Sequence, residues 1–179
     1  TVAQIQEFMR AAQWPTDGEP VLGIHVRRGD AAAADAEPEK STRMSFPLVR
    51  YLEAADGLCE RYGIRYIFLA TESREELERA VALRPQYRFL WLDYDRGLLP
   101  DIRTSSQFIE DLALEHPERA NAIAVTGIFD LWCLCECHAF IGAFNSEFSV
   151  LGWLLSIGSR GNLVPYVSLS RPSMTRHLH

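Results

Sequence analysis

Five short apolar runs mark the strands expected in this chain. They are rich in β-branched and aromatic residues, and each is apolar at consecutive positions rather than at alternate ones. A strand with this pattern is buried on both faces, which is typical of a parallel sheet covered by helices. The runs comprise residues 21–26, 66–70, 88–92, 138–143 and 163–169.

Between these runs, apolar residues recur at helical spacing. Ser73 followed by Glu76 is a capping-box pattern, which predicts that a helix opens at residue 74. His116 and Pro117 are expected to stop another helix. The predicted helices cover residues 1–13, 46–61, 74–83, 105–114, 122–137 and 147–157.

The alternation of strands and helices predicts an α/β fold. Consecutive βαβ units give a Rossmann-like, three-layer parallel sheet with helices on both faces. The length of 179 residues suits one such domain, spanning residues 1–179. A hydrophobic share of 47% and a charged share of 23% are normal for a globular protein, so disorder of the whole chain is not expected.

The charge balance argues against nucleic acid as a partner. There are 18 Lys and Arg against 24 Asp and Glu, a net charge of −6, whereas nucleic-acid affinity comes from neutralising phosphates. No apolar run is long enough for a membrane span, and no secretory signal opens the sequence. Because it starts at Thr1 rather than Met, the chain is expected to be an excerpt or a processed product.

The four cysteines are expected to be small buried hydrophobic residues. Three of them form the string Cys133-x-Cys135-x-Cys137-His138, and the fourth is Cys59. A string of cysteine and histidine residues can bind a metal ion, but no second pair of ligands accompanies this one, so no metal site is predicted. Their spacing does not indicate a disulfide framework.

Polar residues follow three of the predicted strands. In parallel sheets, ligands bind outside the carboxyl ends of the strands, so these residues are expected to share one edge. Arginine side chains and a helix N-terminus both favour an anion such as pyrophosphate. The residues are His25 at the end of the first strand with Arg27, Arg28 and Asp30 following it, Thr71 after the second strand, and Asn145 and Ser146 after the fourth, preceded by the apolar Phe144.

Simpler interpretations of the same residues stay open. An Arg-Arg-Gly-Asp turn is often a solvated loop with a local ion pair, and a histidine inside a strand is often a core residue. Asp130 lies in a strongly apolar helix, where an ionised carboxylate is costly unless it is paired. It could point to solvent, cap the helix end, or accept hydrogen bonds from a purine edge.

Three blocks, in the same order, resemble a known superfamily of fucosyltransferases. Gly23-Ile-His-Val-Arg-Arg-Gly-Asp30 is similar to the first donor-binding motif of the α1,6-fucosyltransferases, nodulation fucosyltransferases and protein O-fucosyltransferases. Ile67-Phe-Leu-Ala-Thr-Glu-Ser73 resembles the second strand of that superfamily. Ile128-Phe-Asp-Leu-Trp and the stretch 138–149 resemble its helix–strand–Ser block. The likeness covers roughly residues 20–157.

The resemblance implies a GT-B enzyme, in which two Rossmann-like domains face each other. This chain corresponds to the C-terminal, donor-binding half, with the acceptor domain absent. GDP-fucose would be the donor and no metal or other cofactor would be needed. Arg27 would contact the β-phosphate, Arg28 the diphosphate or fucose, His25 the nucleoside side and Asp130 the guanine edge. Ser146, with the backbone N–H groups after Phe144, would bind phosphate.

The resemblance also implies inverting transfer of fucose to a hydroxyl of a glycan or glycoprotein acceptor. Arg27 would stabilise the leaving diphosphate, and Asp35 is the best candidate for a carboxylate base, with Glu37 and Glu39 behind it. Ala31 stands where the α1,6 branch has a lysine. A eukaryotic member would work in the secretory pathway, in the Golgi lumen, and a bacterial one in the cytoplasm. The alternatives are a non-catalytic module that binds a nucleotide or GDP-sugar, and a plain α/β interaction domain.

Overall fold

The protein is built on a five-stranded parallel sheet with the strand order β3-β2-β1-β4-β5. The computed structural model describes residues 2–16, 18–27, 46–96 and 114–170. The predicted α/β fold is confirmed, and all five predicted strands are present. They are β1 (Val21–His25), β2 (Tyr66–Ala70), β3 (Arg88–Leu90), β4 (Ala139–Gly142) and β5 (Tyr166–Ser168).

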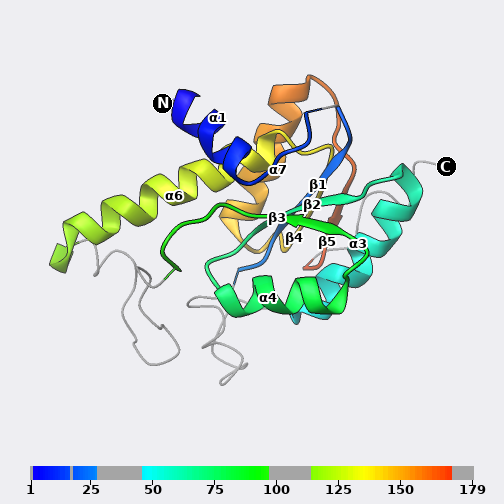
Figure 1. Cartoon of the computed structure of the whole chain (residues 1–179), viewed down its shortest axis with the longest axis horizontal. Coiled ribbons are helices and arrows are strands. Elements are labelled where there is room, and N and C mark those ends of the chain that lie inside the picture. The colour runs from blue at the N-terminus through cyan, green and yellow to red at the C-terminus, as the bar shows by residue number, and fades with distance from the viewer. Residues whose placement is uncertain (1, 17, 28–45, 97–113, 171–179) are drawn as a thin grey trace.

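Helices cover both faces of this sheet, and Figure 1 shows the strands between the two groups. One face packs against α3 and α4, and the other packs against α1, α6 and α7. Because the strands are buried on both sides, nearly every strand residue is apolar, as the sequence pattern requires. The helices are α1 (Val2–Ala11), α3 (Leu48–Tyr62), α4 (Arg74–Leu83), α6 (Pro117–Cys135) and α7 (Glu147–Arg160).

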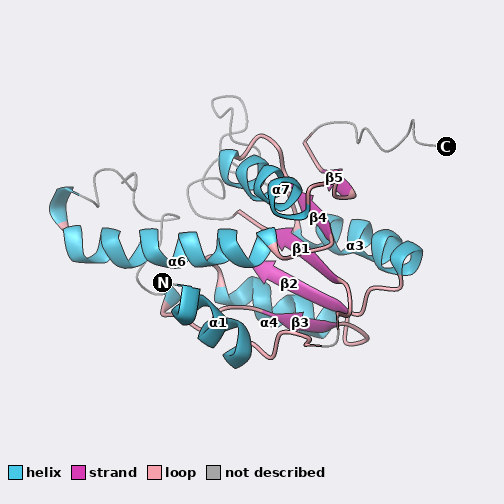
Figure 2. Ribbon diagram, turned by 90° about the horizontal axis from the view of Figure 1, so that it is seen from above, coloured by secondary structure: helices cyan, strands magenta, loops and turns pink. Residues whose placement is uncertain are grey.

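The order of the strands places β1 between β2 and β4. His25 of β1 is in register with Ala70 of β2, and Ile24 is in register with Ile141 of β4. The three strands therefore end at the same level. Figure 2 shows these parallel strands side by side. Between β3 and β4 the chain crosses from one side of β1 to the other. The side of the sheet at which β1, β2 and β4 end, the switch-point edge, is therefore the topological switch point at which α/β folds bind ligands.

Helix α6 begins five residues earlier than predicted. Proline was expected only to stop the preceding helix, and Leu114 and Glu115 are indeed followed by a break at His116. Pro117 then opens α6, because the first turn of a helix needs no N–H from that position and the ring fixes a helical φ. The rest of the helix predicted over 105–114 lies outside the described residues.

The capping box before α4 is present as predicted. The Ser73 side chain accepts a hydrogen bond of 3.3 Å from the backbone N–H of Glu76. This bond satisfies one of the free donors of the first turn and fixes where α4 begins after β2.

The prediction of buried cysteines is confirmed for Cys59, Cys133 and Cys137, while Cys135 is half-buried and all four are free thiols. Burial raises the pKa of Cys137 well above its usual value. A side chain at Gly23 would meet the Cys137 sulfur at 3.0 Å, so the glycine lets the end of α6 approach β1. Within the described ranges, no group of His, Cys, Asp or Glu residues could hold a metal ion.

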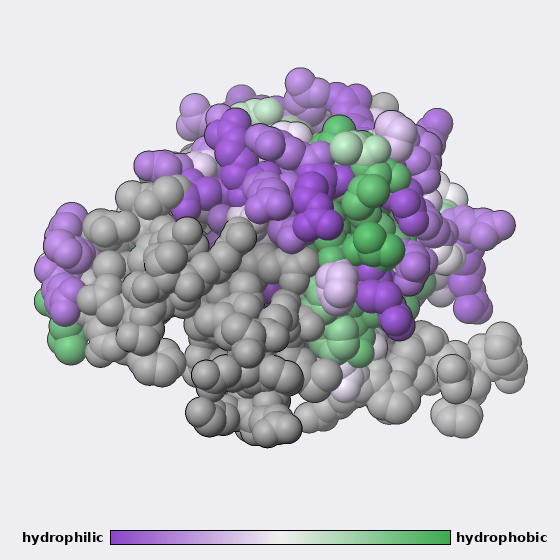
Figure 3. Space-filling view, turned by 90° about the horizontal axis from the view of Figure 1, so that it is seen from below, coloured by the Kyte–Doolittle hydropathy of each residue, from purple (hydrophilic) through white to green (hydrophobic). Residues whose placement is uncertain are grey.

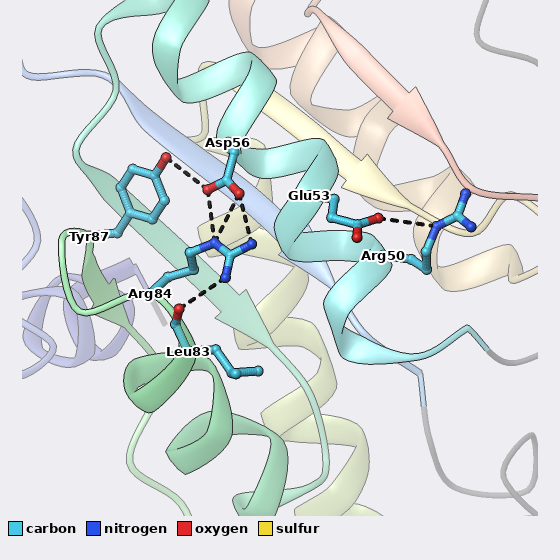
Figure 4. Close-up of polar contacts among 6 residues, drawn as sticks. All are labelled: Arg50, Glu53, Asp56, Leu83, Arg84 and Tyr87. Atoms are coloured by element: carbon cyan, nitrogen blue, oxygen red, sulfur yellow. Dashed lines mark hydrogen bonds and ion pairs between the residues drawn. The ribbon is translucent and has the colours of Figure 1, made fainter.

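A polar cluster joins α3, α4 and the start of β3 away from the switch point. Figure 4 shows the Arg84 guanidinium facing the Asp56 carboxylate, with Nε 3.1 and 2.9 Å from the two oxygens and Nη2 2.9 Å from Oδ2. The Tyr87 hydroxyl donates to the same carboxylate at 3.1 Å. A paired, partly shielded geometry of this kind ties two helices together more firmly than an exposed ion pair does.

Arg84→Ala is expected to lower the free energy of unfolding by about 1–2 kcal/mol, because Asp56 keeps its charge and loses its fork-shaped partner. Urea denaturation measures this change. The control is Arg50→Ala. Arg50 Nε lies 3.5 Å from Glu53 Oε2, and because both side chains are largely exposed, this ion pair should contribute less than about 0.5 kcal/mol. Equal losses in the two variants would contradict the prediction.

The described surface is mostly hydrophilic on the side seen in Figure 3, with one continuous group of hydrophobic side chains. Exposed hydrophobic side chains also lie on two neighbouring helices, with Ile128 and Trp132 on α6 and Leu151 and Leu154 on α7. In the parts of the chain that the structure describes, no helix has the length and apolar character needed to cross a membrane.

Candidate functional site

His25 lies at the carboxyl end of β1, on the face that packs against α7. Its Nδ1 is 2.6 Å from the Ser149 hydroxyl, and its ring lies 4.6 Å from that of Phe148. Only 7% of the residue is exposed. Burial, and after it the charge of Arg27, lower the pKa of His25 to about 3, so the imidazole is neutral at physiological pH.

Arg27 follows two residues later and is half-buried. Alternation along an extended chain places positions 25 and 27 on the same side of the sheet. The positive charge of Arg27 lies close enough to His25 to help lower the pKa of the imidazole. The edge thus carries one neutral ring and one permanent positive charge next to each other, a pair suited to a ligand with both polar and anionic parts.

The beginning of α7 lies beside these residues because β4 ends in a glycine. A side chain at Gly142 would meet Ser149 at 2.9 Å and the ring of Phe140 at 2.8 Å. The absence of that side chain allows α7 to sit directly against the end of the sheet, which brings Ser149 into hydrogen-bonding distance of His25.

Ser146 is the N-cap residue of α7, as the predicted helix boundary implied. It has extended backbone angles, with φ −101° and ψ 121°, but its side chain makes no capping bond. The hydroxyl is buried, and among the described residues it has no hydrogen-bond partner. A buried polar atom without a partner, at the positive end of a helix, is well placed to bind an anion.

Phe144 and Asn145 lead into this helix from β4. The Phe144 ring stacks on Tyr166 at 5.2 Å and packs against Trp153 at 5.3 Å, so its side chain belongs to the aromatic core under the edge. The Asn145 backbone N–H donates to the Ser170 hydroxyl at 3.0 Å. These contacts fix the chain just before the first turn of α7.

Asp130 lies inside α6, and only 6% of the residue is exposed. Of the open interpretations, exposure to solvent and a role at the helix end are therefore excluded. The Tyr94 hydroxyl lies 3.2 Å from Oδ2, while Oδ1 has no hydrogen-bond partner among the described residues. Burial raises the pKa of Asp130 to about 7; Arg96 and the Tyr94 hydrogen bond oppose this rise and Glu72 adds to it.

Thr71, at the end of β2, is joined to two residues that follow β3. Its carbonyl oxygen lies 3.3 Å from the Tyr94 hydroxyl oxygen and accepts a hydrogen bond from Arg96 Nε at 3.2 Å. Arg96 Nη2 also donates to the Leu92 carbonyl at 2.9 Å, and its guanidinium lies 4.2 Å from the centre of the Tyr94 ring. This network holds Tyr94 against Asp130.

Tyr94 and Arg96 are not among the site residues expected from the sequence, because that expectation covers only the residues at the ends of the first, second and fourth strands. The sequence does contain a signal for them, because both residues follow β3 and ligands of parallel sheets bind outside the carboxyl ends of the strands. Their pairing with Thr71 and Asp130 depends on contacts across 23 to 36 residues, which no local pattern contains.

The expectation that the ends of β1, β2 and β4 share one edge is confirmed by the register. The described residues brought there are His25, Arg27, Thr71, Phe144, Asn145 and Ser146, with Asp130 reaching the network beside Thr71 from α6. Arg28, Asp30 and Asp35 were also predicted as site residues and lie outside the described residues.

Comparison with solved structures finds this architecture in fucosyltransferases. Fucosyltransferase NodZ from Bradyrhizobium is 18% identical with a TM-score of 0.51, and the match covers 86% of this chain and 41% of that chain. NodZ alpha-1,6-fucosyltransferase soaked with GDP-fucose is 17% identical with a TM-score of 0.50, and the match covers 86% of this chain and 41% of that chain. POFUT1 in complex with GDP-fucose is 11% identical with a TM-score of 0.56, and the match covers 93% of this chain and 45% of that chain. The chain therefore has a fucosyltransferase-type fold.

The sequence itself matches no protein-family model and no curated protein. The chain spans less than half the length of the fucosyltransferases that share its fold. The likeness is thus one of backbone arrangement.

Proposed function

We propose that this chain is the donor-binding half of a GT-B fucosyltransferase and that its switch-point edge binds GDP-fucose. The observation that carries the proposal is the convergence at one edge of Arg27, His25 and the Ser146 hydroxyl, which has no hydrogen-bond partner among the described residues. A permanent positive charge beside a helix N-terminus favours a diphosphate. That the solved neighbours NodZ and POFUT1 carry GDP-fucose supports this choice of ligand.

The guanine end of the donor is assigned to Asp130. Its Oδ1 is a buried acceptor without a partner in the described part of the chain, and such an atom favours a ligand that offers N–H groups. Guanine offers two such donors, N1–H and the exocyclic amine. The hydrogen bond between the Tyr94 hydroxyl and Oδ2 fixes the orientation of the Asp130 carboxylate, and with it the position of Oδ1.

The chemistry follows from where charge develops. Transfer breaks the bond between fucose C1 and the β-phosphate oxygen, and negative charge grows on the departing GDP. Arg27 and the N-terminus of α7 would stabilise that charge more in the transition state than in the ground state. The acceptor oxygen attacks C1 from the opposite face with inversion and loses its proton to a carboxylate, for which Asp35 is the candidate. This scheme requires no metal.

A glycan or glycoprotein hydroxyl is the proposed acceptor, and a second domain would supply most of its contacts. In a eukaryote the proposed compartment is the Golgi lumen, and in a bacterium it is the cytoplasm. The part of the proposal that concerns the donor can be tested on this chain alone.

GDP and GDP-fucose are expected to raise the melting temperature of the protein and to bind at micromolar concentrations in calorimetry, whereas UDP should bind at least about tenfold more weakly. Equal binding of GDP and UDP, or none of either, would contradict the proposal. Turnover of GDP-fucose by the chain joined to an acceptor domain separates an enzyme from a non-catalytic module that only binds the nucleotide.

A further inference from the structure

Ser149 carries a fully buried hydroxyl, and the resemblance to fucosyltransferases implies no role for it. It is the third residue of α7 and has an exposed fraction of 0%. Its only hydrogen-bond partner among the described residues is Nδ1 of His25, at 2.6 Å. The two residues are 124 positions apart, and the glycine at position 142 makes their approach sterically possible.

The environment of the His25 ring restricts it to one plane. Phe148 packs against it with a centroid distance of 4.6 Å and an interplanar angle of 38°, while Ser149 holds Nδ1. Within the described residues, the ring makes no other hydrogen bond, so Nε2 is the atom left for a ligand. A neutral imidazole carries a proton on one nitrogen only, and the partner of Nδ1 decides which.

The hydrogen-bond balance of Ser149 favours one tautomer. If Nδ1 carried the proton, it would donate to the Ser149 oxygen, and the buried serine O–H would have no acceptor in the described part of the chain. If instead Ser149 donates to an unprotonated Nδ1, that O–H is satisfied and the proton lies on Nε2. The second arrangement avoids a buried donor without a partner.

We propose that Ser149 is a positioning residue: it donates to Nδ1, holds His25 as the Nε2–H tautomer, and thereby makes the ring an N–H donor for an acceptor atom of the bound nucleoside diphosphate. The ligand half of this inference rests on the proposed function. Ser149 itself touches no ligand and acts through His25.

The tautomer is measured by long-range ¹H–¹⁵N correlation NMR on protein with ¹⁵N-labelled histidine. The wild-type protein without ligand should show Nε2 protonated and Nδ1 unprotonated, and Ser149→Ala should shift His25 toward the other tautomer or a mixture. The same substitution should weaken GDP binding by about tenfold in calorimetry. The wild-type spectrum needs no variant, so it decides the tautomer even if the alanine variant folds poorly.

Ser156→Ala is the matched control. Ser156 lies on the same helix, has an exposed fraction of 0% and donates at 2.7 Å to the Trp153 carbonyl, but it has no contact with His25. This variant should leave the His25 signals unchanged and the GDP dissociation constant within about twofold.

Two results would overturn the inference: a protonated Nδ1 in the wild-type protein, or GDP binding by Ser149→Ala as tight as that of Ser156→Ala. Failure of the wild-type protein to bind GDP would instead overturn the proposed function and, with it, the role of His25 toward a nucleotide. The spectrum would then still report whether Ser149 fixes the tautomer.

Discussion

Arg27→Ala is expected to weaken GDP binding by about a hundredfold, equivalent to about 3 kcal/mol. Arg27 is the described residue that brings permanent positive charge to the end of β1, next to the neutral His25 ring. A guanidinium binds a phosphate through two parallel N–H bonds, and in a partly buried place these bonds are weakly screened. Calorimetric titration with GDP measures the loss.

Arg27→Lys should fall between the wild-type protein and the alanine variant, because the ammonium keeps the charge and loses the planar fork. The control is Arg65→Ala. Arg65 precedes β2 at the opposite edge of the sheet, where it pairs with Glu19 at 2.6 Å, and its removal should leave GDP affinity unchanged. If Arg27→Ala and Arg65→Ala bind GDP alike, the diphosphate does not lie at this edge.

GDP affinity is expected to rise about tenfold per pH unit up to pH 7 and to level off above it. Asp130 must be ionised to accept two N–H groups of guanine, and burial raises its pKa in the free protein to about 7. Below that pH, binding has to displace a proton. Asp130→Asn should remove this slope and bind GDP about ten- to a hundredfold more weakly at pH 8.

The same carboxylate makes stability depend on pH in the opposite sense. The pKa of Asp130 lies above its ordinary value of 3.8, so the folded state binds more protons between these values and stability is lost as pH rises. Between pH 5 and pH 8 the loss should be roughly 3 kcal/mol, at about 1.4 kcal/mol per pKa unit. Urea denaturation of Asp130→Asn should show this component removed.

Asp93→Asn is the control for both measurements, because Asp93 is exposed and follows β3 just before Tyr94. It should retain the pH dependence of the wild-type protein in binding and in stability. A wild-type GDP affinity that is constant from pH 6 to pH 8 would contradict the assignment of Asp130 to the guanine edge.

Local patterns in the sequence determined the skeleton of this protein. Continuous apolar runs identify the strands because a doubly covered strand has no polar face, and Ser73 with Glu76 marks the start of α4 because the capping bond spans only three residues. The shared edge of His25, Thr71 and Ser146 also follows from the sequence, because parallel strands in βαβ order must end on the same side.

Only the tertiary structure decided what these residues touch. Ser149 meets His25, and Tyr94 meets Asp130, through contacts between elements far apart in the chain, and the close approach at Gly142 depends on how α7 packs on β4. The raised pKa of Asp130 has the same origin. Burial is a property of the assembled fold rather than of the residue, so a carboxylate in an apolar helix acquires its chemistry only when its neighbours exclude water.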